Sequence, residues 1–365
     1  MKGLYIHIPF CKTICSYCDF NKMVSKIEKH ESYINRLIEE INEYKDSLNN
    51  LSSIYIGGGT PNSIELNLLE SLFKALKPYS DNLLEYSIEV NPELITEELC
   101  ILLAKYNISR VSIGVQTIND ESIKLLNRHH DKDIVINSIN LLRKYNIDNI
   151  NIDMIFGIPN TTIEDVKNDL NFILSLPIKH VSYYSLIIED KTVIKYKIDK
   201  GEIIELDDDT IADMYELVSN TLNCNEFNQY EISNYAKEGY ESNHNLLYWT
   251  QNEYVGLGLN AVSFINNKRL QNTNLMKNYL ISFNKEEELL SEYELKQEYM
   301  MLGLRKTKGI NIREYYSRFN SNVFDDFNLQ RFIENKLLIN ENDNLFINTD
   351  KIFVANIIFE EFVGE

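Results

Sequence analysis

The chain has 365 residues, of which 44% are hydrophobic and 25% are charged, and its formal net charge is −19. This length suffices for a large core and a second, smaller domain, whereas the acidic charge, without a cluster of Lys and Arg, disfavours nucleic acid as a partner. No stretch approaches the roughly 20 apolar residues of a membrane span, and the N-terminus lacks the pattern of a signal peptide, so we expect a cytoplasmic protein.

Three of the five cysteines follow the first predicted strand with the spacing Cys11-x3-Cys15-x2-Cys18. Three thiolates on one short loop can each bind a different iron of a [4Fe–4S] cluster and leave the fourth iron open for another ligand. A structural zinc site usually takes two separated pairs of ligands, and no second pair exists in the sequence. A redox pair would use only Cys15 and Cys18 and leave Cys11 unexplained. The spacing therefore favours the cluster, in a reducing compartment.

Strand and helix patterns alternate through the first half of the chain. The strand-like runs, rich in Ile, Val and Tyr, are Leu4 to Ile8, Ser53 to Ile56, Tyr86 to Val90, Arg110 to Val115, Asn149 to Ile155 and His180 to Ile188. Between them, Glu31 to Tyr44 has the apolar stripe of a helix, and Thr161 with Glu164 predicts a capping box that opens another. Six such units predict an α/β fold whose parallel strands form a partial (β/α)6 barrel over 1–200. Functional residues then lie at the carboxyl ends of the strands.

The pattern changes after about residue 190. We expect 201–290 to be a connecting region. In it, the pattern of Asp207 to Asn220 predicts a helix, and Asn243 to Trp249 is a polar stretch. Further along, Tyr254 to Phe264 predicts a glycine-interrupted strand, and Glu286 to Glu288 predicts a solvated helix face. The next segments are helix candidates at Glu294 to Leu304, Ile312 to Phe319 and Leu329 to Asn335, and a hairpin at Leu337 to Asn348. They predict a smaller C-terminal α+β domain of winged-helix-like type over 291–365.

The segment from Tyr5 to Cys18 resembles the first strand and cluster loop of the radical SAM superfamily, and more narrowly of its HemN-like branch, the coproporphyrinogen dehydrogenases. The resemblance covers nearly the whole chain and rests on several motifs in the same order. It implies that S-adenosylmethionine (SAM) binds at the open iron. It also implies that an electron from the reduced cluster would cleave SAM, while the protein supplies binding, orientation and exclusion of water.

The same resemblance assigns contacts to SAM or the cluster at the ends of the predicted strands. Glycines after the second strand let the backbone approach a ligand closely. Glu89 and Asp153 can take the cationic groups or ribose hydroxyls of SAM, and Arg128 offers a forked donor for its carboxylate. The positions implied in this way are Tyr5, Tyr17, Gly57, Gly58, Gly59, Thr60, Glu89, Gln116, Arg128, Asp153 and Ile187.

Two features separate this chain from the dehydrogenases. Phe20 stands where they carry a further cysteine, and the extended segment before their first strand is missing. A third feature, His244-Asn-Leu-Leu-Tyr248-Trp249, matches the HNxxYW motif of HemW-type proteins, which are haem chaperones. An imidazole can ligate haem iron, and the two aromatic rings could pack on a flat macrocycle. A histidine beside two aromatics is, however, also a common structural, hydrogen-bonded arrangement.

These patterns predict a haem chaperone that holds a [4Fe–4S] cluster on Cys11, Cys15 and Cys18, binds SAM, ligates haem through His244 and passes haem to an acceptor protein. The expected partners are haem, the acceptor protein and an electron donor. The acceptor could be associated with a membrane, and a second copy of the chain could form a homodimer. The rival hypotheses are an oxygen-independent coproporphyrinogen III dehydrogenase, which performs two oxidative decarboxylations, and a non-catalytic protein whose cysteines bind zinc.

Overall fold

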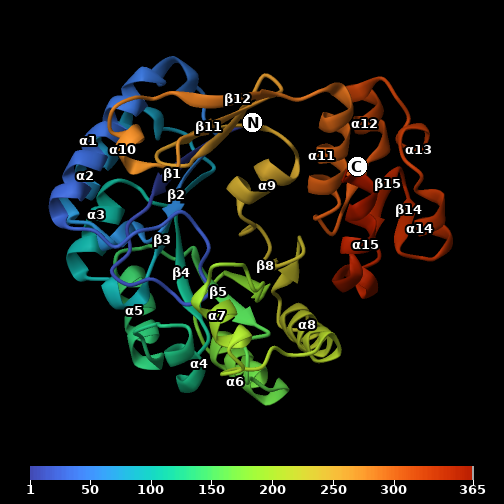
Figure 1. The fold of residues 1–365 in the computed structure, drawn as a ribbon, viewed down its shortest axis with the longest axis horizontal. Coiled ribbons are helices and arrows are strands. Elements are labelled where there is room, and N and C mark those ends of the chain that lie inside the picture. Colours follow the sequence, from blue (N-terminus) through green and yellow to red (C-terminus); the bar gives the residue numbers. More distant parts are fainter. Residues whose placement is uncertain (364–365) are drawn as a thin grey trace.

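A computed structural model describes residues 1–363, so the last two residues of the predicted C-terminal domain lie outside the described residues. Within this range twelve strands form one sheet in the order β12-β11-β10-β9-β1-β2-β3-β4-β5-β6-β8-β7, and three form a second sheet, β13-β15-β14. Figure 1 shows the large sheet curving around the left and centre of the view, with the small sheet apart from it on the right. The predicted α/β class with a smaller C-terminal domain is confirmed.

Six neighbouring strands of the large sheet are parallel, as the alternation of strands and helices predicts. They are β1 (Lys2–Ile8), β2 (Ser53–Gly58), β3 (Glu85–Val90), β4 (Arg110–Gln116), β5 (Ile150–Phe156) and β6 (His180–Ser185). The helices of this part are α1 (Ile27–Glu43), α2 (Leu66–Leu76), α3 (Glu97–Lys105), α4 (Asp120–Leu125), α5 (Lys132–Lys144), α6 (Ile163–Leu174) and α7 (Val193–Asp199). Figure 1 places α1, α2, α3 and α5 on the outer side of the curved sheet.

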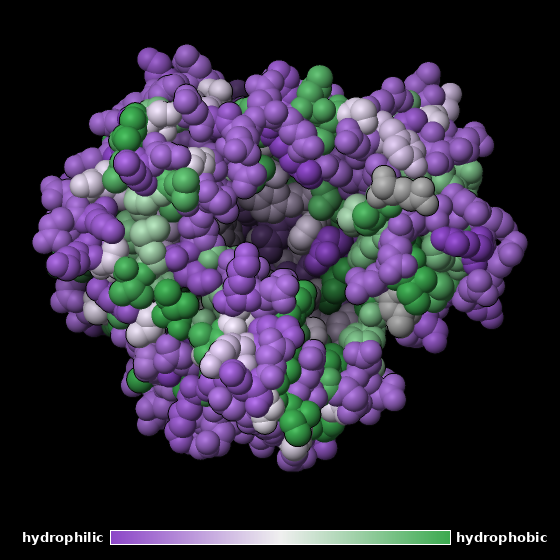
Figure 2. Space-filling view, viewed as in Figure 1, coloured by the Kyte–Doolittle hydropathy of each residue, from purple (hydrophilic) through white to green (hydrophobic). Residues whose placement is uncertain are grey.

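The two faces of these strands differ in polarity because successive side chains point to opposite sides. The outer face carries Leu, Ile, Val and Met side chains that belong to one large hydrophobic core with the helices. The inner face is almost entirely polar and comprises Tyr5, His7, Ser53, Tyr55, Glu85, Ser87, Glu89, Arg110, Ser112, Asn151, Asp153, His180, Ser182 and Tyr184. We call the space that this inner face encloses the lumen. Figure 2 shows the molecule hollowed at its centre, where Figure 1 has the space between the barrel strands and α9.

The region from 201 to 290 adds strands at both edges of the same sheet. β9 pairs in parallel with β1, and β8 pairs antiparallel with β6. The elements of this region are α8 (Asp208–Asn223), β7 (Asn228–Gln229), β8 (Asn234–Ala236), α9 (Asn243–Trp249), β9 (Glu253–Leu257), β10 (Val262–Ile265), β11 (Lys268–Asn272), α10 (Met276–Tyr279) and β12 (Lys285–Leu289). The predicted domain boundaries stay a prediction.

The C-terminal part builds a second hydrophobic cluster of its own, from Tyr299 to Phe362. Its elements are α11 (Glu292–Gly303), β13 (Ile310–Asn311), α12 (Ile312–Phe319), α13 (Val323–Asp326), α14 (Gln330–Glu334), β14 (Leu338–Glu341), β15 (Asn344–Ile347) and α15 (Asn356–Phe359). The predicted hairpin is present as β14 and β15, which pair antiparallel. No helix within residues 1–363 combines the length and the apolar character that crossing a bilayer requires.

Several local predictions need correction. The capping box of α6 is formed by Thr162 and Asp165, one residue beyond the predicted pair, while the Thr161 hydroxyl donates to the carbonyl of Ile158. β6 ends at Ser185 rather than at residue 188, and the predicted strand from 254 to 264 is two strands, β9 and β10, joined by a turn. The polar stretch from 243 to 249 is the helix α9. The predicted helix face at 286–288 is the exposed strand β12.

Candidate cluster and cofactor site

The three cysteines lie on the loop that leaves the carboxyl end of β1, and all three are half-buried. The loop is fixed by backbone hydrogen bonds: the amide of Cys11 donates to the carbonyl of Met23 at 3.0 Å, and the amide of Ser16 donates to that of Leu126 at 3.0 Å. Burial raises the pKa of the Cys11 thiol to about 11 and also raises that of Cys18. Iron must therefore displace thiol protons when it binds, as metal binding to cysteine generally does.

The arrangement of the cysteines bears on which metal they could hold. Among the side chains of residues 1–363, no three His, Cys, Asp or Glu residues converge on a point where one metal ion could be bound. A single zinc ion needs such convergence. An iron–sulfur cluster does not, because each thiolate bonds to a different iron. The arrangement of the three cysteines is therefore compatible with a cluster.

A glycine cradle lies beside the cysteine loop at the end of β2. A Cβ on Gly59 would lie 2.8 Å from the carbonyl oxygen of Phe10 and 3.0 Å from the Cys11 sulfur. Gly58 has φ +115°, which a residue with a side chain rarely adopts, and a Cβ there would meet the His7 ring at 2.5 Å. The Thr60 hydroxyl lies 3.5 Å from the Cys11 sulfur. These glycines thus allow β2 and the loop to approach each other, and they leave backbone groups facing the site.

Two carboxylates point into the lumen below this cradle. Glu89 accepts hydrogen bonds from the Tyr55 hydroxyl at 2.7 Å and from the Gly58 amide at 3.1 Å. Burial raises the pKa of Glu89 to about 7. Asp153 accepts from the Ser112 hydroxyl at 2.8 Å and from the Asn151 amide at 2.7 Å. The half-buried carboxylate of Asp153 therefore has the hydrogen-bond partners that burial requires.

Gln116 and Arg128 complete the rim with polar atoms that have no protein partner. Gln116 lies at a register shift between β4 and β5 and has φ +68°, a strained backbone conformation for a residue with a side chain. Within residues 1–363 its buried Oε1 and the Nε of Arg128 make no hydrogen bond. Arg128 donates through Nη1 to Asn91 at 3.0 Å and to the Cys15 sulfur at 3.6 Å, and through Nη2 to the carbonyl of Gly114. Such unsatisfied atoms are expected where a polar ligand binds.

The remaining predicted positions fall into two groups. Tyr5 and Tyr17 lie within the site: the Tyr5 hydroxyl lies 3.0 Å from Nδ1 of His7, and charges on Cys15 and Arg128 act on the pKa of Tyr17, which burial raises. Ile187 has a side chain that is 71% exposed, so only its backbone could face the site. Tyr55, Ser112 and Asn91 are partners that sequence patterns missed. The polar alternation along β2 and β4 is the signal that could have identified the first two.

The HNxxYW segment forms α9, which closes the amino-terminal end of the lumen. The backbone amide of Asn243 donates to Glu85 at the start of β3 at 2.6 Å, and the helix is capped by Ser242. His244 is 1% exposed. Its Nδ1 lies 2.8 Å from the hydroxyl of Ser53, and its Nε2 lies 2.9 Å from that of Tyr248. In this conformation both ring nitrogens are therefore hydrogen-bonded, and burial lowers the pKa of His244 to about 3, so the ring is neutral.

A cavity of about 240 Å³ lies on the far side of α9, between this helix, β9 to β11 and α11 of the C-terminal part. Its lining comprises Tyr248, Trp249, Gln251, Asn252, Tyr254, Phe264, Arg269, Glu298 and Leu302. The guanidinium of Arg269 pairs with Glu298 at 2.6 Å. The predicted aromatic pair of the motif thus borders a small, largely aromatic cavity at a boundary between parts of the molecule, a common position for ligand sites.

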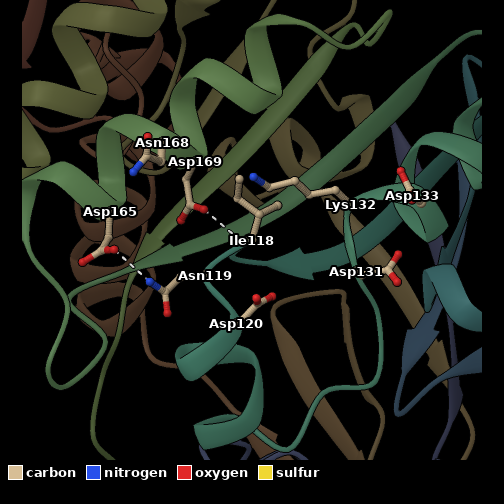
Figure 3. Close-up of a pocket in the computed structure, with 9 residues that line it drawn as sticks. All are labelled: Ile118, Asn119, Asp120, Asp131, Lys132, Asp133, Asp165, Asn168 and Asp169. Atoms are coloured by element: carbon tan, nitrogen blue, oxygen red, sulfur yellow. Dashed lines mark hydrogen bonds between the residues drawn. The ribbon is translucent and has the colours of Figure 1, made fainter.

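A larger cavity of about 630 Å³ is lined by residues from the first turns of α4, α5 and α6 and includes none of the cysteines (Figure 3). Five aspartates contribute to its lining, and three of them already stabilise local structure. Asp131 caps α5, Asp165 belongs to the capping box of α6, and Asp169 accepts from the amide of Ile118 at 2.8 Å. Their carboxylates are used by the fold, so we assign no ligand to this cavity.

Comparisons with known proteins agree with this geometry. Residues 5–173 match the family model of the radical SAM superfamily, and residues 290–349 match that of the HemN C-terminal domain. The heme chaperone HemW of Lactococcus lactis is 37% identical over 98% of this chain and 96% of its own length. The heme chaperone HemW of Bacillus subtilis is 35% identical over the full length of both proteins.

Among solved structures, the coproporphyrinogen III oxidase HemN of Escherichia coli, a radical SAM enzyme, matches with a TM-score of 0.85. The match covers 99% of this chain and 89% of that one at 20% sequence identity, which shows a common fold. The resemblance that the cysteine loop and the HNxxYW motif indicate is confirmed by the full-length similarity to the two HemW proteins. The chain belongs to the HemW family of the radical SAM superfamily.

Proposed function

We propose that this protein is a haem chaperone that holds a [4Fe–4S] cluster, binds SAM and haem, and transfers haem to an acceptor protein. Membership of the radical SAM superfamily implies the cluster and SAM. The observation that carries the proposal is the identity of 37%, over 98% of the chain, to a protein named heme chaperone HemW.

The residues around the cysteine loop would have separate tasks. The thiolates of Cys11, Cys15 and Cys18 would bind three irons and leave the fourth open. Glu89 would accept hydrogen bonds from the cationic or hydroxyl groups of SAM, and Arg128 would donate to its carboxylate. When bound, the cluster and SAM supply one-electron chemistry, and the chain contributes binding, orientation and exclusion of water.

Haem binding is proposed at α9. His244 is neutral, so a lone pair is available for iron once one of its hydrogen bonds opens. Ligation through Nε2 requires the Tyr248 hydroxyl to move away, because it lies 2.9 Å from that atom. The adjoining cavity of about 240 Å³ is smaller than the roughly 300–1,000 Å³ of usual ligand pockets. A haem that reached α9 from this side would therefore remain partly outside the cavity.

The cluster is tested by anaerobic reconstitution followed by absorption and EPR spectroscopy, with and without SAM. We expect the wild type to show a reducible [4Fe–4S] signal that SAM changes, and Cys15→Ala to lose it because one iron loses its thiolate. Cys224→Ala is the matched control, because Cys224 is exposed and far along the chain from the loop. A wild type that assembles no cluster would contradict the proposal.

Haem ligation is tested with two variants of α9. His244→Ala should weaken haem binding about tenfold or more and shift the Soret band, while the cluster spectrum stays intact. Tyr248→Phe removes the hydroxyl that occupies Nε2, so it should bind haem as tightly as the wild type or more tightly. If His244→Ala titrates with haem like the wild type, the ligand role of His244 is excluded, and His244 is a structural residue of α9 at the end of the lumen.

A further inference from the structure

One side chain on β2 contacts both of the sites that the proposed function assigns to ligands. Tyr55 faces the lumen and is half-buried. Its hydroxyl donates to Glu89 at 2.7 Å, and its ring stacks on the ring of His244 with a centroid distance of 5.0 Å and an interplanar angle of 23°. Glu89 is the proposed SAM contact, and His244 is the proposed haem ligand. A change in the position of Tyr55 therefore reaches both sites.

The geometry of β2 explains why one residue can span the two sites. Ser53, Tyr55 and Gly57 are alternate residues of the strand, so they share its inner face. At one end, the Ser53 hydroxyl lies 2.8 Å from Nδ1 of His244. At the other end, a Cβ on Gly57 would lie 2.8 Å from the carboxylate of Glu89. Tyr55 stands between these two contacts and is the side chain that joins them.

The start of α9 is anchored by residues outside β2. The amide of Asn243 donates to Glu85 on β3 at 2.6 Å, and the side chain of Ser242 caps the helix. These contacts hold the backbone of the first turn in place. A movement of Tyr55 therefore acts on the ring of His244 rather than on the position of the whole helix.

We propose that Tyr55 is a positioning residue that couples the two sites, so that SAM and haem each tighten the binding of the other. This inference rests on the proposed function, because it takes Glu89 as a SAM contact and His244 as the haem ligand. A cationic group of SAM beside Glu89 favours the charged form of the carboxylate, and a charged carboxylate is the stronger acceptor for the Tyr55 hydroxyl. With SAM bound, the Tyr55 ring is therefore held more firmly against His244.

A firmly held Tyr55 ring orients the imidazole for its ligand. The hydroxyl of Tyr248 lies 2.9 Å from Nε2 of His244 and must leave before iron can bind there. The stacked Tyr55 ring keeps the imidazole in place when that bond opens, so less conformational freedom is lost on ligation. The coupling is reciprocal, because the factor by which SAM tightens haem binding is also the factor by which haem tightens SAM binding.

The test titrates haem into the anaerobic protein with its cluster in the oxidised state, so that bound SAM is not cleaved. The Kd for haem is measured from the Soret band without SAM and with saturating SAM. The Kd for SAM is measured by equilibrium dialysis without haem and with saturating haem. We expect SAM to tighten haem binding about fivefold or more, within the usual range of coupling between two sites, and haem to tighten SAM binding by the same factor.

Two variants of Tyr55 separate its two contacts. Tyr55→Phe keeps the stacked ring and loses the bond to Glu89, whereas Tyr55→Leu loses both contacts. Both variants should bind each ligand, but the presence of one ligand should no longer change the Kd of the other. The matched control is Tyr86→Phe, which removes a hydroxyl without a partner in the range 1–363 from the large hydrophobic core. Its coupling should equal that of the wild type.

A wild type in which SAM leaves haem binding unchanged, or weakens it, would overturn the inference. Wild-type coupling in both Tyr55 variants would also overturn it, because the two ligands would then act on each other without this side chain. Failure of the proposed function looks different: a wild type that binds no SAM or no haem reveals this in the single titrations, before any coupling is measured.

Discussion

At the residue scale, Glu89 shows how the lumen controls a single side chain. Two donors hold its carboxylate, and the neighbouring charge of Asp153 adds to the effect of burial in raising its pKa to about 7. Tyr55 and Gly58 oppose this shift, because a hydrogen bond to the carboxylate favours its charged form. In the folded protein Glu89 keeps its proton up to about pH 7, whereas in the unfolded chain it loses the proton in the ordinary carboxyl range. The contribution of Glu89 to the free energy of unfolding therefore falls as pH rises from that range to 7.

The same raised pKa predicts how SAM binding depends on pH. If Glu89 binds the ammonium or ribose of SAM, SAM should bind more tightly as pH rises from 5.5 to 7, because the carboxylate gains its charge in this range. Glu89→Gln should bind SAM weakly with little pH dependence, as measured by equilibrium dialysis with the cluster reconstituted. Tyr55→Phe removes a donor that lowers the pKa, so its binding curve should shift to higher pH. A Glu89→Gln variant with the wild-type curve would exclude this role.

The residues that sequence patterns identified are those whose signal is local. Cys11, Cys15 and Cys18 are set by spacing within one loop, and Glu89 and Asp153 lie on predicted strands. The unsatisfied Gln116 atom and the partners of Arg128 depend on contacts between segments far apart in the chain. His244 illustrates the limit of a motif: its type and spacing are visible, but its bonds to Ser53 and Tyr248 are not.

At the element scale, local propensity identified the strands of the barrel, while long-range pairing decided the misassigned elements. The acidic run from 286 to 288 has no apolar stripe and became the strand β12 because it pairs with β11, where Lys268 forms an ion pair with Glu287. The polar stretch at α9 became a helix because two side chains accept hydrogen bonds from its first amides. One is Ser242, directly before the helix, and the other is Glu85, from a strand almost 160 residues earlier. Neither partner is evident from the periodicity of the segment itself.

The fixing of α9 by Glu85 predicts a large effect on stability. Glu85 is buried, accepts from Ser87, Ser242 and the amide of Asn243, and its negative charge favours the charged form of the buried Arg110. Glu85→Ala should lower the free energy of unfolding by about 3–5 kcal/mol, because it leaves a buried cation and several donors without a partner. Urea unfolding followed by circular dichroism measures this. Glu286→Ala, at an exposed position of β12, should change it by less than about 0.5 kcal/mol; similar values for both variants would contradict this role for Glu85.

At the scale of the whole molecule, the C-terminal part is joined to the barrel through the segments that flank α9. Residues 230–232 pair with residues 305–307, and the side chain of Gln251 donates to the carbonyl of Leu295 at 3.0 Å. The guanidinium of Arg305 lies over the ring of Trp249, 4.6 Å from its centre. The helix α9 therefore closes the end of the lumen, lines the aromatic cavity and lies at this junction. A ligand at α9 would contact both parts.

This junction makes Trp249 a specific reporter, because it is the only tryptophan in the chain. In the wild type, urea unfolding followed by Trp fluorescence and by circular dichroism should coincide if the two parts unfold together. Arg305→Ala removes the cation over the ring, worth about 1 kcal/mol, and the positive charge beside buried Glu231. The fluorescence transition of this variant should therefore precede the circular dichroism transition, as the C-terminal part separates first. Arg313→Ala, which removes only an exposed pair with Asp343, should leave both transitions unchanged. Coincident transitions in Arg305→Ala would mean that the backbone pairing at 230–232 alone keeps the two parts together.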